Sequence, residues 1–344
     1  MNKVTIFLWL MPIILNAQSI TVKVIDELGT PVEGAEVRVI YERLQHLKGS
    51  QTKEGKTNEE GIFRCSGSAM LGLWFWAKKE GYYDYGYNPA ERDYLGMNEY
   101  PDKLEKTILL RRVINPVALY AKRTQEGSHH SNYFIKIPET SEWCGYDLAA
   151  GDWVKPHGDG EVADLMLRFK RDFIEFEERR SPLDLRRKAI QRKYERLGKE
   201  FTEDAFKFEA GLWDLSLEVA FPKKKEGLVR VTDSFIPQSI LRMPHQAPEE
   251  GYEPAYGFRI KSNEYLSRPK DVGFFLRTRV LLDEDGEIES ANYAKIYGDL
   301  MINVKGEVSF TYYFNPVPND RNLEFDTSRN LFGDDVEGSR VNLP

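Results

Sequence analysis

The chain contains 344 residues, of which 41% are hydrophobic and 30% are charged. This composition excludes a wholly disordered chain and supplies enough apolar side chains for about two domains of ordinary size. The 48 basic and 55 acidic residues give a net charge of -7. Such a balance argues against a nucleic-acid-binding protein, because these proteins usually present a basic surface.

Residues 1–17 have the three-part pattern of a secretory signal peptide. A short basic start precedes an uncharged apolar run over 4–15, and small Ala17 stands where a signal peptidase would cut. The run is too short for a membrane span, which needs about 20 apolar residues. We therefore predict cleavage after Ala17 and export to the periplasm, the cell surface or the medium, without a transmembrane segment. A buried N-terminal strand or helix is the alternative.

Short strands separated by turns follow over residues 18–115. Ile20, Val22 and Val24 alternate with their neighbours at a period of two, which is typical of a strand. Further strand patterns lie at 37–41, 62–63, 71–77 and 107–111. Strands at this spacing without a helical stretch predict a β-sandwich of the seven-stranded type.

The turns of this region carry a recognisable series of residues. They are Val24-Ile25-Asp26, Gly29-Thr30-Pro31-Val32, Gly34-Ala35 and Val37, then Thr57-Asn58, Gly61-Ile62-Phe63, Lys79 and Gly81-Tyr82. In order and rough spacing the series resembles carboxypeptidase regulatory-like domains, which have a transthyretin-like (prealbumin-type) β-sandwich fold. The resemblance covers about residues 19–115 and does not extend to the remainder. It implies a non-catalytic accessory module, and the fold alone does not define a function.

Trp74 and Trp76 are the candidate ligand-contact residues of this module. They lie two positions apart and therefore on the same face of a strand. Exposed, the two indoles would form an aromatic platform for sugar rings. Buried, they would belong to the sandwich core, and the apolar neighbours favour the core.

A linker over 116–131 leads to a second, larger domain over 132–333. Its strand patterns lie at 133–138, 164–173, 208–221, 274–282, 288–297 and 308–314. Asp285-Gly286 between two of them is typical of a hairpin turn. These patterns predict an antiparallel β domain, followed by a frayed polar tail over 334–344.

One inserted amphipathic helix is predicted near residues 182–201. Ser181 is the expected N-cap, Pro182 occupies the first helical position, and Asp184 completes a capping box. One face is apolar and the other carries Arg186, Arg187, Lys188, Arg192, Lys193 and Arg196. The basic face is either solvated, which we favour, or a contact for an anionic partner.

Two cysteines, Cys65 and Cys144, remain after the predicted cleavage. An exported chain meets an oxidising environment, so a disulfide between them is one interpretation. Two buried free thiols are the other. A bridge needs a Cα separation of ~4.4–6.8 Å, which the sequence does not reveal.

No motif predicts a catalytic or metal site. The five histidines lack the spacing of a zinc peptidase, and the sequence has no Gly-x-Ser-x-Gly, phosphate-binding loop or Cys-x-x-Cys motif. We therefore predict no cofactor and no metal. Two weaker hydrolase hypotheses stay open: Cys144 with His157 as nucleophile and base, and an unidentified pair of carboxylates.

Segment 312–326 is the last candidate site. Its Pro, Asn and Asp residues predict a loop directly after a strand. Tyr312 and Arg321 would contact a polar ligand at the rim of the domain. Alternatively, Arg321 holds the strand end together through the nearby acidic residues, and this latch is the interpretation we favour.

Taken together, these patterns predict a mainly β, exported and non-catalytic protein with a structural or ligand-binding role. Its partner would be a glycan or another exported protein, and not a nucleic acid. A carbohydrate-binding protein that uses exposed aromatic residues is one alternative. A hydrolase with its site within residues 132–330 is the other.

Overall fold

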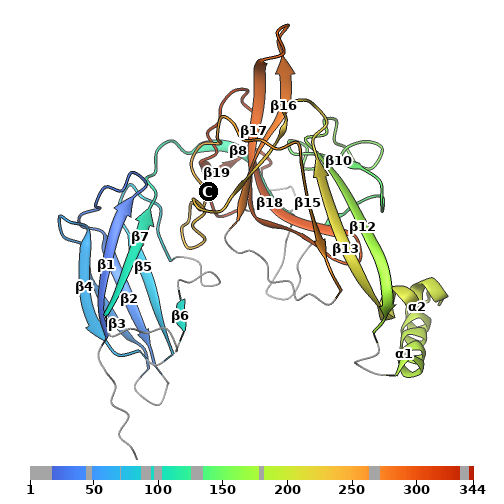
Figure 1. Cartoon of the computed structure of the whole chain (residues 1–344), viewed down its shortest axis with the longest axis horizontal. Helices are drawn as coiled ribbons and strands as arrows, with labels where there is room; N and C mark the ends of the chain where they lie inside the picture. Colours follow the sequence, from blue (N-terminus) through green and yellow to red (C-terminus); the bar gives the residue numbers. More distant parts are fainter. Residues whose placement is uncertain are drawn as a thin grey trace, which may run out of the picture. The chain divides into compact units, whose positions relative to one another are not determined.

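The computed structural model describes residues 18–43, 49–69, 71–86, 94–96, 103–124, 135–177, 182–262, 272–333 and 341–344. The predicted signal peptide and the predicted N-cap Ser181 lie outside these ranges. The chain divides into two compact units (Figure 1). Met1–Ile114 and Ile236–Arg242 form the first, and Asn115–Phe235 and Met243–Pro344 the second. The described residues contain nineteen strands and two helices, which confirms the predicted mainly β fold.

The first unit has a three-stranded and a four-stranded sheet. The three-stranded sheet has the order β4 (Ile62–Gly67), β1 (Gln18–Asp26), β7 (Lys103–Leu110), with β1 antiparallel to β4 and parallel to β7. The four-stranded sheet is antiparallel, in the order β3 (Gln51–Lys56), β2 (Glu36–Glu42), β5 (Gly72–Lys78), β6 (Tyr94–Gly96).

Both sheets of the first unit bury one face in a common hydrophobic core. The alternating residues Ile20, Val22 and Val24 of β1 are fully buried there, together with Val39 of β2 and Phe75 of β5. Because each strand sends alternate side chains to opposite faces, two sheets that share one core form a sandwich. The predicted seven-stranded type of sandwich is thus present.

A short segment from much later in the chain completes the first unit. Ser239 forms an antiparallel bridge with Tyr85, and the N–H of Gly86 donates to the carbonyl of Gln238 at 2.8 Å. Ile236 packs against the sandwich core. The sequence placed Ile236–Arg242 in the second domain, because a single added bridge of this kind leaves no periodic pattern.

The second unit has two sheets. A five-stranded sheet runs β11 (Asp152–Trp153), β10 (Cys144–Asp147), β12 (Leu165–Phe176), β13 (Gly211–Ala220), β15 (Ala255–Ile260). A seven-stranded sheet runs β14 (Gly227–Val231), β16 (Gly273–Leu282), β17 (Ile288–Ile302), β18 (Glu307–Asn315), β8 (Val117–Arg123), β19 (Phe325–Asn330), and β9 (Ile135–Lys136) also pairs with β18. The pairings are antiparallel except that of β19 with β8.

The seven-stranded sheet is buried on both faces. Phe274 and Tyr312 point into a core shared with the five-stranded sheet. Phe275 and Tyr313, their neighbours in sequence, point into a second core on the opposite face. This double burial explains the nearly continuous apolar runs of β16 and β18.

Two parts of the predicted organisation need correction. Residues 117–123, assigned to a linker, form β8 inside the seven-stranded sheet. The predicted frayed tail ends in an ordered segment: Val341 is 3% exposed, and the Tyr313 hydroxyl donates to the carbonyl of Leu343 at 2.9 Å. Both segments are ordered by contacts with residues far away in the sequence, and not by a hydrophobic pattern of their own.

The predicted helix is present as α1 (Leu183–Arg196) and is followed by a second, α2 (Glu203–Ala210). Both lie at one end of the β12–β13 hairpin (Figure 1). The Thr202 side chain caps the N-terminus of α2 by accepting a hydrogen bond from the N–H of Ala205. Because α2 continues to Ala210, the strand expected from residue 208 begins at Gly211 instead. α1 buries none of its residues, but its basic face is only partly solvated. Three of its cations form ion pairs within the unit: Arg186 with Glu177, Arg187 with Glu203 and Lys193 with Glu209. No helix among the described residues has the length and apolar character needed to cross a bilayer.

Candidate functional site

Trp74 and Trp76 point away from the sandwich core. Along β5, the alternate residues Leu73, Phe75 and Ala77 are 1%, 3% and 0% exposed, whereas both tryptophans are half-buried on the other face. The interpretation of the pair as sandwich core is therefore wrong. Large apolar side chains occupy both faces of β5, so the sequence alone could not show which face was inside.

Three rows of side chains make up the outward surface of this sheet, which we call the outer face. The rows follow the strand register and are Trp74–Ile40–Thr52, Trp76–Arg38–Glu54 and Lys78–Glu36–Lys56. Alternation along β2 and β3 predicts these outward positions, but only the strand pairing brings them together. The sequence therefore did not reveal the charged rows.

Polar contacts fix both indoles on the outer face. The Nε1–H of Trp74 donates to Oε2 of Glu42 at 3.2 Å. The Trp76 ring has two cations near it, with the Arg38 Cζ 5.3 Å and the Lys78 Nζ 5.4 Å from its centroid. These distances are within the range of cation–π attraction, which holds the ring in an ordered position at the surface. The result is an ordered aromatic surface with two cations over the Trp76 ring.

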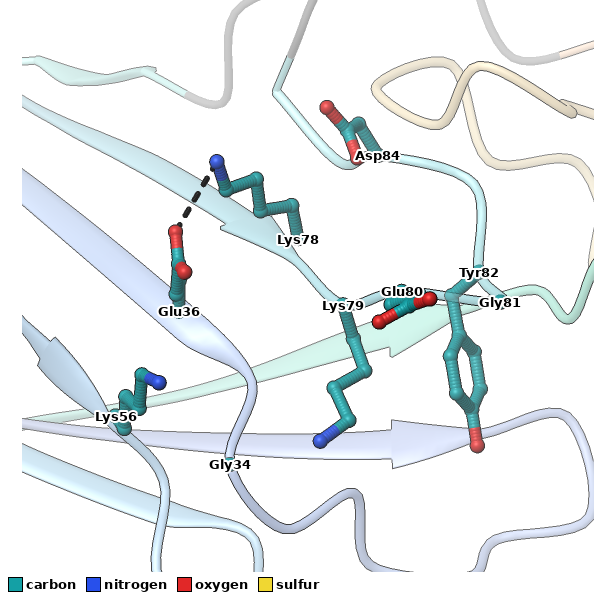
Figure 2. A pocket seen from close by; sticks show the side chains of 9 residues that line it. All are labelled: Gly34, Glu36, Lys56, Lys78, Lys79, Glu80, Gly81, Tyr82 and Asp84. Atoms are coloured by element: carbon teal, nitrogen blue, oxygen red, sulfur yellow. Dashed lines mark ion pairs between the residues drawn. The ribbon is translucent and has the colours of Figure 1, made fainter.

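A pocket of about 660 Å³ continues the outer face at the end of the row that contains Lys78. Figure 2 shows its lining residues, which are Gly34, Glu36, Lys56, Lys78, Lys79, Glu80, Gly81, Tyr82 and Asp84. The Lys78 Nζ lies 3.1 Å from Oε2 of Glu36 and 5.4 Å from the Trp76 centroid. Lys78 therefore connects the aromatic surface to the pocket.

The charges of the pocket lining are not all neutralised by ion pairs. Among the described residues, Lys56 and Lys79 form no ion pair, and Lys79 Nζ lies 3.1 Å from the position that a Cβ of residue 34 would occupy. Gly34 has a φ of +66°, which is favoured only for glycine, and this leaves room for the ammonium group. Burial raises the pKa of Asp84 above its ordinary value, and the positive charge of nearby Lys78 offsets only part of this rise.

The two candidate residues of segment 312–326 have structural roles. Tyr312 is 0% exposed and its hydroxyl donates to the carbonyl of Leu148 at 3.0 Å, so no ligand reaches it at the rim. Arg321 donates to the carbonyl of Ala247 at 2.9 Å and pairs with Glu249 at 2.8 Å. Arg321 thus forms a latch, with partners that lie far away in the sequence instead of the neighbouring acids.

Cys65 and Cys144 are free thiols in the structure, each within its own unit. Cys65 lies 3.4 Å from the Tyr41 hydroxyl, and Cys144 is 1% exposed in the core of the second unit. Burial raises the pKa of both thiols. A buried thiol with a raised pKa is a poor nucleophile, which argues against the hypothesis that Cys144 acts with His157.

Two buried acids of the second unit, Asp147 and Asp164, form a structural ion cluster with Arg279. Asp147 and Asp164 both bind Arg279, at 2.8 Å and 2.9 Å. Backbone N–H groups also donate to both carboxylates, which occupies the oxygens that a hydrolase would need free. In the described part of the chain, no group of three or more His, Cys, Asp or Glu residues could hold a metal ion.

Comparison with known proteins adds little to this geometry. No family model and no curated protein matches the chain. Among solved structures, 3-chlorocatechol 1,2-dioxygenase from Rhodococcus opacus 1CP is 10% identical, with a TM-score of 0.23, over 28% of this chain and 61% of that chain. A streptococcal ancillary pilin is 8% identical, with a TM-score of 0.22, over 36% and 44%. The chain thus spans less than two thirds of the length of both.

A third structure matches over a greater length. A candidate carbohydrate-binding protein from Bacteroides uniformis is 8% identical, with a TM-score of 0.17, over 88% of this chain and 98% of that chain. TM-scores this low carry no argument about fold or function.

Proposed function

We propose that this protein is an exported, non-catalytic glycan-binding protein whose ligand contacts the outer face of the β2–β5 sheet. The outward orientation of Trp74 and Trp76 is the observation that carries the proposal. Indole rings combine a large apolar surface with a polar N–H group, and they are favoured where a ligand is partly apolar and partly polar. The C–H faces and hydroxyl groups of a sugar ring match both properties.

We further propose that the first unit is a carboxypeptidase regulatory-like module. Four glycines of the series noted in the sequence have positive φ, namely Gly29, Gly34, Gly61 and Gly81. Glycine is the residue type that adopts this conformation without strain. These glycine turns within a sandwich support the assignment, in which the module presents a ligand-binding face and the second unit has a structural role.

Export is proposed from the pattern of residues 1–17. When the chain is produced in an exporting host, we expect the intact mass of the non-reduced product to be that of residues 18–344 with two free thiols. A product that keeps Met1 would contradict export by this signal. A mass lower by two hydrogen atoms would instead establish the disulfide between Cys65 and Cys144.

Replacement of the tryptophans tests the glycan-binding proposal. We expect Trp74→Ala and Trp76→Ala each to weaken binding to a glycan found on an array by at least about tenfold. Because both rings are half-buried on the outer face, the free energy of unfolding should fall by only about 1 kcal/mol. Isothermal titration and urea denaturation measure the two quantities.

Two further variants serve as controls. Trp143→Ala removes a tryptophan of the second unit that is 37% exposed and lies 4.5 Å from the Arg168 Cζ, so glycan binding should not change. Phe75→Ala removes an inward ring of the same strand and should cost about 3–5 kcal/mol. Full glycan affinity in folded Trp74→Ala and Trp76→Ala proteins would contradict the proposal.

A further inference from the structure

We infer that the glycan is anionic and that its acidic group binds between Lys56 and Lys79, in the pocket beside the outer face. This inference rests on the proposed function and names the class of glycan. It follows from the charges of the pocket, from the positions of the two lysines and from the continuity of the pocket with Trp76.

The row Lys56–Glu36–Lys78 contains two lysines but only one carboxylate, that of Glu36. Glu36 pairs with Lys78 at 3.1 Å, which leaves Lys56 without an ion pair among the described residues. Lys79 contributes to the same pocket a second ammonium group that has no ion pair among the described residues. An anionic group of a ligand would neutralise both, and charge-assisted hydrogen bonds of this kind are stronger than neutral ones.

The two lysines lie at one end of the pocket. In Figure 2, Gly34 lies between Lys56 and Lys79, and Asp84 lies at the other end. Since Gly34 has no side chain, its backbone leaves room for the Lys79 ammonium, which lies 3.1 Å from the position that a Cβ would occupy. The carboxylates of Glu80 and Asp84 accept hydrogen bonds, which suits the hydroxyl groups of the same sugar. Lys56 and Lys79 therefore lie near Gly34, and the acceptor Asp84 lies at the far end of the pocket.

The pocket and the aromatic surface can bind one extended ligand. Trp76 and Lys78 lie two positions apart on β5, which is roughly 6.5 Å. A sugar ring against Trp76 would thus place its neighbour at the mouth of the pocket. An acidic group on that neighbour would reach Lys56 and Lys79.

Two pairs of polymers with the same sugar backbone, one member neutral and the other acidic, test the inference: dextran with dextran sulfate, and methyl-esterified pectin with polygalacturonate. We expect at least one acidic polymer to bind at least about tenfold more tightly than its neutral partner. Sulfate and carboxylate as the recognised group are distinguished by which pair responds. The variant Lys56→Gln/Lys79→Gln should lose this preference, and its binding should depend less on salt.

Two control variants exclude unspecific attraction of polyanions. Lys23→Gln removes an exposed charge from β1, in the other sheet of the sandwich, and should have no effect. Lys188→Glu/Arg192→Glu reverses charges on α1 and should also leave binding unchanged. Loss of binding in the α1 variant, with full binding in the pocket variant, would overturn the inference.

The outcomes also separate this inference from the proposed function. Equal binding of neutral and acidic polymers, lost in Trp76→Ala, would overturn the inference and leave glycan binding intact. Binding to neither pair nor to any glycan on an array would overturn both. A preference for the acidic polymer that disappears in the pocket variant supports both.

Discussion

Replacing Asp164 with alanine is expected to lower the free energy of unfolding of the second unit by about 3–5 kcal/mol. Asp164 is 0% exposed and accepts hydrogen bonds from the Arg279 guanidinium, at 2.9 Å from both Nε and Nη2, and from the N–H of Leu148 at 2.8 Å. The variant would leave a largely buried guanidinium with one carboxylate fewer, and an unpaired backbone donor. The midpoint of urea denaturation, followed by tryptophan fluorescence, measures the loss.

Glu249→Ala is the matched control for this prediction. Glu249 forms an arginine–carboxylate pair of nearly the same length, 2.8 Å to Arg321, but its side chain is 77% exposed. An exposed pair contributes about 0–1 kcal/mol because water solvates both charges. If Asp164→Ala and Glu249→Ala destabilised the protein equally, the buried cluster would have no special structural role.

The second acid of the cluster makes its stability depend on pH. Burial by itself raises the pKa of Asp147, but three backbone N–H donors and the Arg279 guanidinium outweigh it and hold the pKa below its ordinary value. The stabilisation is therefore present above the ordinary pKa of an aspartate and is lost as the pH falls toward the lowered one. We expect Asp147→Asn to show a smaller loss of stability than the wild type between neutral pH and pH ~3.

Arg279 also shows why alternation along β16 does not by itself predict which of its side chains are buried. Strict alternation along the strand pattern of 274–282 would place Leu282 on the same face as Val280, two positions earlier. In the structure the register of β16 and β17 shifts between Thr278 and Leu281, and Arg279 has a φ of 53°. Val280 is 3% exposed whereas Leu282 is 36% exposed. The ion cluster stabilises this bulge, and ion pairs with Asp147 and Asp164 leave no mark in the sequence near residue 279.

The sandwich and the presence of most strands could be predicted because their patterns are local. Alternation in β1 and β2 and the turn glycines depend only on neighbouring residues. The outer face could not be predicted in full, because Lys56, Glu36 and Lys78 meet through the pairing of three strands. The orientation of Trp74 and Trp76 likewise depends on which face of β5 meets the core.

Segments ordered by distant contacts were the main errors of the sequence-based predictions. β8 lies among strands that follow it by about 190 residues, and Val341 fills a core whose other members lie elsewhere in the second unit. Neither segment has a long periodic pattern, so each resembles a linker or a tail. Their order comes from burial against partners that only the folded chain brings close.

Replacing Gly61 with alanine is expected to lower the free energy of unfolding of the first unit by about 2–5 kcal/mol. Gly61 has a φ of +72°, and a Cβ at this position would lie 2.4 Å from the carbonyl oxygen of Val24. That contact is with backbone, so relief requires β1 to move. The same carbonyl accepts a hydrogen bond from the N–H of Val32 at 3.0 Å, which such a movement would weaken.

Gly29→Ala separates the two causes of this effect. Gly29 has a similar φ of +78°, but a Cβ there would meet no atom within 4 Å. The Gly29 variant therefore carries only the cost of the left-handed backbone, about 1–2 kcal/mol, whereas the Gly61 variant carries that cost and the clash. Thermal or urea unfolding of both variants gives the difference directly. Equal destabilisation would mean that Val24 adjusts freely and that the Gly61 turn is not held against β1.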